Sequence, residues 1–308
     1  MTPDQNTHTC PGLPADWVNG WLAAVGATVL VPGLRLSWTT DALPVARLNH
    51  PDGDPLAQLI EAWPDAQRLN TMPLARDHPG CEHPIERRVP VAAFTERIRA
   101  TGQHRDAWML TSTMTDLAVD KELVTHAPFD PAAPGSTKWL HHRLVKTHSC
   151  VTEPSKQIAD TLAGLAAPVA GNGLGFDLSR LGEGPRLVHP VVEVLAFFGL
   201  ALLPVRGDGV IRRYPHPSQR GWQIDGRKVF LWPAWTQPLN CHGIDALLDT
   251  WHSSWRYRKV RNRNKHEWKP DYTAWERLGV HAGWNSTQYT PTARAETNRG
   301  FGSRRLTP

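Results

Sequence analysis

The stretch His189–Pro204, HPVVEVLAFFGLALLP, is the most continuously apolar run of the chain, and the fold prediction starts from it. Pro190 suits the first turn of a helix, Glu193 lies near the positive end of the helix dipole, and Pro204 ends the helix. The run is shorter than the roughly 20 apolar residues that cross a bilayer. The sequence therefore predicts a buried core helix and no membrane contact.

A second stretch, Trp21–Pro32 (WLAAVGATVLVP), is similar to Val194–Pro204 (VLAFFGLALLP). The alignment pairs two leucines, two alanines and two glycines, which are Leu22 with Leu195, Ala23 with Ala196, and Gly26 with Gly199. A glycine in each helix would allow another element to pack closely against it.

Both apolar runs are followed by short alternating stretches and then by an apolar pattern at helical spacing. GLRLSWTTDALPVARL and DPLAQLIEAW follow Pro32, whereas GVIRRYP, KVFLWPAW and GIDALLDTWHSSW follow Pro204. We therefore predict an α+β fold with two helix-hairpin-helix units as a possible pseudo-repeat, and a basic C-terminal extension. A chance likeness between two alanine- and leucine-rich helices is the alternative. The predicted domains are residues 1–130, residues 131–255, and a basic, partly flexible tail at 256–308.

The 308 residues are 40% hydrophobic, which is enough for a packed core, and 27 prolines with 24 glycines indicate many loops. The N-terminal MTPDQNTHTCPG has neither a signal-peptide nor a transit-peptide pattern. The four cysteines are far apart in the sequence, which fits a reduced compartment better than a disulfide framework. We expect a cytoplasmic protein.

Charge is distributed unevenly along the chain. Residues 256–308 contain twelve Lys or Arg and four Asp or Glu, a net charge of +8, so the whole-chain charge of +5 leaves −3 for residues 1–255. The densest part is WRYRKVRNRNKHEWK, in which aromatic residues stand among the cations. Cations attract phosphates and aromatic rings stack with bases, so this segment is typical of a single-stranded nucleic-acid interface. A solvated charged helix and tail is the alternative.

The predicted contacts in this segment are Arg256, Tyr257, Arg258, Lys259, Arg261, Arg263, Lys265, Trp268 and Lys269. A second set, Lys138, Arg143 and Lys146, comes from GSTKWLHHRLV at 135–145 and the lysine that follows it, where Ser136 or Thr137 is the predicted helix cap. Lys138, His141, His142 and Lys146 would share much of one helix face. That face is either phosphate-contacting or simply solvated.

The sequence contains no motif of a known catalytic site. GxSxG, GxxxxGK[ST], HExxH and paired CxxC are all missing, and AGNGLGFD at 170–177 lacks the strand and helix of a dinucleotide fingerprint. His78, Cys81 and His83 match no familiar zinc spacing and are better interpreted as part of a proline-rich loop. Elsewhere, VAAFTERIRAT predicts a helix and DAWMLTSTMTDL a strand. We predict no catalytic residue, metal or cofactor.

Four segments occur in an order that resembles a CRISPR-associated family. They are STKWLHHRLVK, GNGLGFDLSRLG, HPVVEVLAFFGLALLPVRG and FLWPAWTQPL, the last followed by a helical pattern, and together they extend over about residues 135–251. The family is the short, large-subunit-like protein of type I-U operons, now called subtype I-G.

The resemblance implies a non-catalytic subunit of a crRNA-guided, Cascade-like complex in antiviral defence. Such a subunit would contact crRNA, target DNA or both, together with other effector subunits. The resemblance assigns no catalytic residue to this chain. The alternative is a metal-dependent nuclease whose acidic residues, such as Asp177, Glu193 and Asp208, converge only in the folded state.

Overall fold

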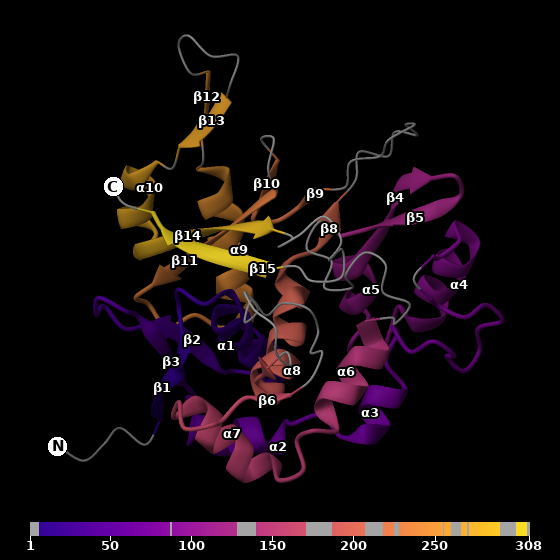
Figure 1. Ribbon diagram of the computed structural model, residues 1–308, viewed down its shortest axis with the longest axis horizontal. Coiled ribbons are helices and arrows are strands. Elements are labelled where there is room, and N and C mark those ends of the chain that lie inside the picture. Colours follow the sequence, from indigo (N-terminus) through magenta and orange to yellow (C-terminus); the bar gives the residue numbers. More distant parts are fainter. Residues whose placement is uncertain are drawn as a thin grey trace.

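The computed structural model describes residues 6–86, 88–127, 140–170, 187–206, 218–224, 228–254, 256–259, 266–269, 271–289 and 300–306 (Figure 1). Its helices are α1 (Val18–Leu30), α2 (Pro55–Glu61), α3 (Ala66–Asn70), α4 (Val91–Thr101), α5 (Trp108–Thr113), α6 (Leu140–His148), α7 (Pro154–Leu162), α8 (Pro190–Gly199), α9 (Cys241–Ser253), α10 (Tyr272–Arg277) and the short 3₁₀ helix η1 (Leu200–Leu202).

The strands are β1 (Thr7–Pro14), β2 (Arg35–Trp38), β3 (Val45–Asn49), β4 (Met114–Asp120), β5 (Leu123–His126), β6 (Val169–Ala170), β7 (Leu187–Val188), β8 (Val205–Arg206), β9 (Ser218–Gln219), β10 (Trp222–Ile224), β11 (Lys228–Trp235), β12 (Arg256–Lys259), β13 (His266–Lys269), β14 (Val280–Tyr289) and β15 (Gly300–Arg305). The two larger antiparallel sheets have the orders β1-β3-β2 and β10-β11-β14-β15. The protein is therefore of the α+β class, as predicted.

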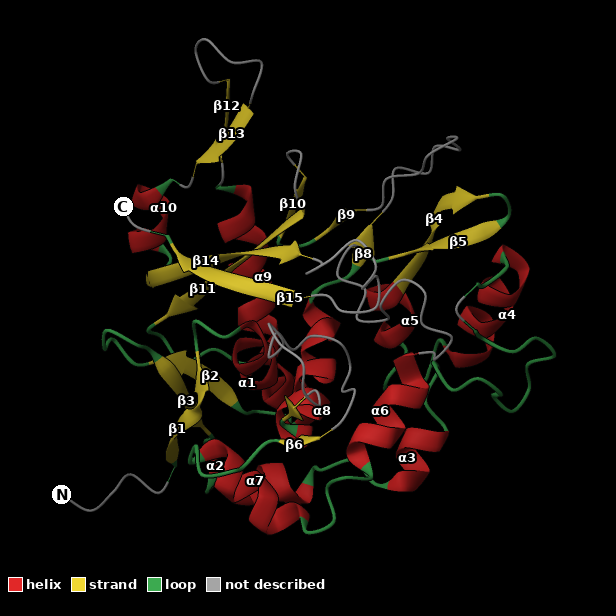
Figure 2. Cartoon of the chain, viewed as in Figure 1, coloured by secondary structure: helices red, strands yellow, loops and turns green. Residues whose placement is uncertain are grey.

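The helices α1 and α8 form the centre of the core and pack directly against each other. Every residue of α8 is buried, and its N-cap His189 precedes Pro190 in the first turn, as the sequence predicts. Figure 2 shows α2 and α7 below this helix pair, α3 and α6 to its right, and the four-stranded sheet above it. No helix in the described part of the chain is both long and apolar enough to pass through a lipid bilayer.

The two aligned glycines lie in equivalent close contacts between α1 and α8. A Cβ atom on Gly26 would lie 1.8 Å from the Leu195 carbonyl oxygen, and one on Gly199 would lie 2.3 Å from the Leu22 carbonyl oxygen. Leu22 and Leu195 are themselves aligned in the sequence. The glycine of each helix therefore contacts the backbone of the aligned leucine in the other helix. Only glycine permits such an approach of two backbones.

The elements after α1 follow the prediction closely. Strands β2 and β3 form the predicted antiparallel hairpin, and Asp54 caps α2 by accepting hydrogen bonds from the N–H groups of Leu56 and Ala57. After α8 the pattern differs, because β8 pairs with β9 and β11 pairs with both β10 and β14. The predicted strand GVIRRYP lies outside the described residues.

The predicted strand DAWMLTSTMTDL is wrong in its first half, because Trp108–Thr113 form α5 and only Met114 onward is extended. Trp108 packs its ring against Phe197 and Phe198 of α8, at centroid distances of 5.8 and 6.0 Å. Tertiary packing thus overrides the β propensity of the Thr-rich segment.

Three buried tryptophans of the core bind β11 to the N-terminal part of the chain. The indole Nε1 of Trp21 donates to the Pro233 carbonyl (2.8 Å), that of Trp232 to the Ala15 carbonyl (2.7 Å), and that of Trp235 to the Leu36 carbonyl (2.9 Å). Each bond satisfies a buried polar group at the same time as the ring fills the core.

The core contacts and the strand order bear on the predicted division of the chain into domains at 130/131 and 255/256. The α1–α8 packing and the indole bonds join residues 1–130 to residues 131–255 in one hydrophobic core. The strand β14, from the predicted tail, lies between β11 and β15 in the four-stranded sheet. Contacts thus cross both predicted divisions of the chain.

Candidate nucleic-acid interface

The basic C-terminal segment begins with a two-stranded hairpin of β12 and β13, which we call the basic hairpin. Its antiparallel register pairs Arg256 with Lys269, Tyr257 with Trp268, Arg258 with Glu267, and Lys259 with His266. Figure 1 shows the basic hairpin extending beyond the body of the molecule, at the top of the view. The alternative of a charged helix for this segment is wrong at the described residues, which are extended.

The residue types explain why an extended pair forms here. Tyr257 and Trp268 have high β propensity and oppose each other directly. In the backbone register, Arg258 is paired with the acidic Glu267 and Arg256 with the basic Lys269.

The helices on either side of the basic hairpin in the sequence, α9 and α10, pack against each other. Trp251 of α9 and Trp275 of α10 are buried, and their ring centroids lie 5.5 Å apart. His252, also on α9, donates from Nε2 to the Leu231 carbonyl of β11 (3.1 Å), and burial lowers the pKa of His252 to about 4. The neutral imidazole thus ties α9 to β11 of the four-stranded sheet.

The described backbone includes six of the nine contacts predicted in this segment. They are Arg256, Tyr257, Arg258 and Lys259 on β12, with Trp268 and Lys269 on β13. The other three, Arg261, Arg263 and Lys265, lie outside the described residues.

The structure describes the second predicted set only in part. Lys138 lies outside the described residues, Arg143 is half-buried, and Lys146 is exposed on α6. His141, predicted on the same face, instead points toward α3 and donates from Nε2 to the Leu69 carbonyl (2.7 Å). Burial is the main cause that lowers the pKa of His141. The expectation of one shared face is therefore wrong for His141.

Another histidine of α6 has a structural role of the same kind. His148 Nε2 donates to the Pro64 carbonyl (2.7 Å), and its ring stacks on Trp63. Burial lowers the pKa of His148 as well. In Figure 1, α6 and the basic hairpin lie on opposite sides of the body, so the two predicted sets do not form one continuous surface.

Three arginines in the described part of the C-terminal segment are exposed and were not among the predicted contacts. Arg277 lies in the last turn of α10, and Arg304 lies on β15. The neighbouring Arg305 donates to the Ala42 carbonyl (2.9 Å). The net charge counted over residues 256–308 includes all three arginines. The prediction named only contacts within residues 256–269, because Lys and Arg are most concentrated there.

The acidic residues of the nuclease alternative are not brought together in the described structure. Glu193 is buried at the α1–α8 contact, where it accepts a hydrogen bond from Asn19 Nδ2 (3.1 Å). Asp177 and Asp208 lie outside the described residues. Within the described ranges, no group of three or more His, Cys, Asp or Glu is placed to hold a metal ion.

The loop with His78, Cys81 and His83 is held by Glu96 of α4. The Glu96 carboxylate accepts from the Glu82 N–H (2.6 Å) and from His83 Nδ1 (2.8 Å). The bond from the Glu82 N–H is the largest of the effects that lower the pKa of the Glu96 carboxyl. These contacts make the loop part of the fold.

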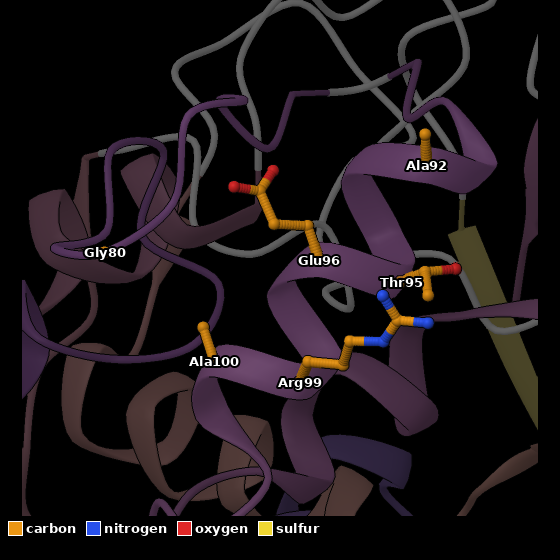
Figure 3. Close-up of a pocket in the computed structure, with 6 residues that line it drawn as sticks. All are labelled: Gly80, Ala92, Thr95, Glu96, Arg99 and Ala100. Atoms are coloured by element: carbon orange, nitrogen blue, oxygen red, sulfur yellow. The ribbon is translucent and has the colours of Figure 1, made fainter.

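An open pocket of about 590 Å³ lies between this loop and α4, lined by Gly80, Ala92, Thr95, Glu96, Arg99 and Ala100 (Figure 3). In Figure 3 the side chains of Glu96 and Arg99 extend from α4 in different directions. The Glu96 oxygens already accept hydrogen bonds from the loop, and Arg99 extends in another direction. These two charged side chains therefore do not converge on one ligand position in the pocket. The basic hairpin is the stronger candidate.

No family model matches the sequence, and no curated protein or solved structure matches the chain.

Proposed function

We propose that this chain is a non-catalytic, nucleic-acid-binding subunit of a type I CRISPR effector complex. The observation that carries the proposal is the basic hairpin, in which Arg256, Arg258, Lys259 and Lys269 stand on paired strands that extend from the body. These four residues are cationic, so binding of phosphates to them would release counterions. The resemblance of residues 135–251 to the short, large-subunit-like family supports the choice of complex.

In this proposal the ligand is crRNA, target DNA or both, and the other partners are effector subunits from the same operon. The role is binding and positioning, which requires a rigid support for the hairpin. The Trp251–Trp275 contact holds the neighbouring helices α9 and α10 together, and the His252 bond to Leu231 joins α9 to the sheet, which favours that role. Copurification with the operon neighbours tests the assembly.

The proposal extends to the origin of the fold, which we interpret as a pseudo-repeat of helix, hairpin and helix. The reciprocal contacts of Gly26 and Gly199 with the aligned leucines support it. The basic extension is then an addition that follows the second unit in the sequence, and the basic hairpin is its first part.

The test of the proposed function is nucleic-acid binding as a function of salt. We expect the variant with Arg256, Arg258, Lys259 and Lys269 changed to Ala to bind single-stranded RNA or DNA more weakly and with less salt dependence. Each lost phosphate contact lowers the slope of log affinity against log salt by about 0.7 on a single strand, so four contacts give a change near 3. Fluorescence anisotropy at several salt concentrations measures it.

The matched control removes four exposed cations from other elements. Arg88, Arg99, Arg105 and Lys156 are exposed and far in sequence from the hairpin, and changing them to Ala alters the net charge equally. The control should retain the parental slope. Equal losses in both variants would mean that only net charge matters, and parental binding by the hairpin variant would remove the hairpin from the interface. Turnover of the nucleic acid with Mg²⁺ or Mn²⁺ would instead favour the nuclease.

A further inference from the structure

The strand register of the basic hairpin sorts its residues onto two faces. In an antiparallel pair, residues directly opposite each other share a face, and successive residues of a strand alternate between faces. The pairs Tyr257 with Trp268 and Lys259 with His266 therefore share one face. The pairs Arg256 with Lys269 and Arg258 with Glu267 share the other.

The two faces differ in their chemistry. One, the aromatic face, has Tyr257 and Trp268 directly opposite each other with Lys259 and His266 beside them. The other, the arginine face, has Arg256, Arg258 and Lys269 with a single acid, Glu267, a net charge of +2. Aromatic residues offer stacking to unpaired bases, whereas the guanidinium and ammonium groups suit phosphates.

We propose that the basic hairpin is a reader of single strands, with bases stacked on the aromatic face and phosphates bound along the arginine face. This inference rests on the proposed function and specifies the class of nucleic acid. A duplex presents phosphates but keeps its bases stacked inside, so it would engage the arginine face and leave the aromatic face without a partner. A single-stranded nucleic acid that crosses the edge of the basic hairpin can contact both the aromatic face and the arginine face.

The proposal assigns two measured quantities to different residues: the dependence of affinity on the presence of bases, and the slope of log affinity against log salt. Substitutions in a general basic patch would not separate them in this way. Tyr257 and Trp268 of the aromatic face set how much affinity depends on the presence of bases, whereas the arginine face, together with Lys259, sets the salt slope. Stacking contributes roughly 5- to 150-fold in affinity per base. Each phosphate contact contributes about 0.7 to the salt slope.

The experiment measures binding to an oligothymidine and to an abasic oligonucleotide of the same length, over a range of salt. Tyr257→Ala with Trp268→Ala should weaken binding to oligothymidine at least 5-fold, leave binding to the abasic strand unchanged, and keep the salt slope. Arg256→Ala with Arg258→Ala should lower the salt slope by about 1.4 on both strands and keep the ratio between them.

Conservative variants guard against loss of the hairpin itself. Tyr257→Phe with Trp268→Phe retains aromatic rings and β propensity and should restore the preference for oligothymidine, and Arg256→Lys with Arg258→Lys should restore the slope. If the aromatic and arginine variants change both quantities alike, the division into two faces is wrong although the hairpin still binds. If the parental protein prefers duplex over single strand, the single-strand assignment is wrong. If the parental protein binds no nucleic acid, the proposed function itself fails.

Discussion

The α1–α8 pair and the basic hairpin are held together by opposite means. In the helix pair, backbones approach so closely at Gly26 and Gly199 that no side chain fits between them, and every residue of α8 is buried. In the hairpin, two short strands extend from the body, and their backbone register pairs Arg256 with Lys269. The helix pair is a contact within the core, whereas the hairpin is rich in basic residues and lies away from that core. We therefore expect substitutions in the first region to change stability and substitutions in the second to change binding.

Substitution in the helix pair is the strongest way to test this contrast. Gly199→Leu, and even Gly26→Ala, should destabilise the protein, because the nearest atoms are the carbonyl oxygens of Leu22 and Leu195 and a backbone cannot move aside as a side chain can. We expect a loss at or above the upper end of the usual overpacking range of roughly 1–3 kcal/mol. Denaturant unfolding monitored by circular dichroism measures the loss.

Gly243→Ala on α9 is the matched control, because a Cβ there meets the side chain of Leu239 at 3.2 Å and that side chain can adjust. A small effect is expected. If Gly26→Ala costs no more than Gly243→Ala, the close contact of α1 with α8 is wrong.

The junction between α9 and β11, formed by His252, gives a second test, through the pH dependence of stability. Burial holds the pKa of His252 at about 4, below its ordinary 6.5, so between these values the unfolded chain binds a proton that the native chain does not. Stability contributed by the neutral imidazole is therefore complete above about pH 7 and is lost as pH falls toward 4, by up to roughly 3 kcal/mol. Nearby Arg220 favours the neutral form and Asp249 opposes it.

His252→Gln removes the titration while keeping an N–H donor for the Leu231 carbonyl. Thermal unfolding between pH 7 and pH 4 should then show a shallower decline than in the parent. Burial lowers the pKa of His141, His148 and His281 as well, so part of the pH dependence should remain. An unchanged decline would place the acid sensitivity outside the α9–sheet junction.

The smallest effect on stability is expected in the hairpin. Arg256→Ala with Arg258→Ala changes two residues of a hairpin that extends from the body of the molecule, away from the core. The free energy of unfolding should stay within about 0.5 kcal/mol of the parent, as for most surface substitutions. A loss as large as that of a core glycine would mean that the hairpin is a structural element of the fold.

The sequence by itself determined the elements whose pattern is local. The helices α1, α4, α8 and α9 and the hairpin β2–β3 were predicted from apolar periodicity, proline positions and alternation. The likeness of the two apolar helices also pointed to Gly26 and Gly199, whose contacts are equivalent in the structure. The concentration of charge after residue 255 is likewise a property of the sequence alone.

Only the tertiary structure decided which segments meet. That α1 packs on α8, that the indoles of Trp21, Trp232 and Trp235 bind distant carbonyls, and that β14 joins β11 depend on contacts across more than forty residues of chain. The same holds for Trp108, which turns a strand-like segment into α5 by packing on α8, and for His141, whose burial against Leu69 removes it from a surface it would share by helical spacing. The physical reason is that periodicity reports which face of an element is apolar, whereas the partner of that face is set by shape, by buried hydrogen bonds and by the whole core at once.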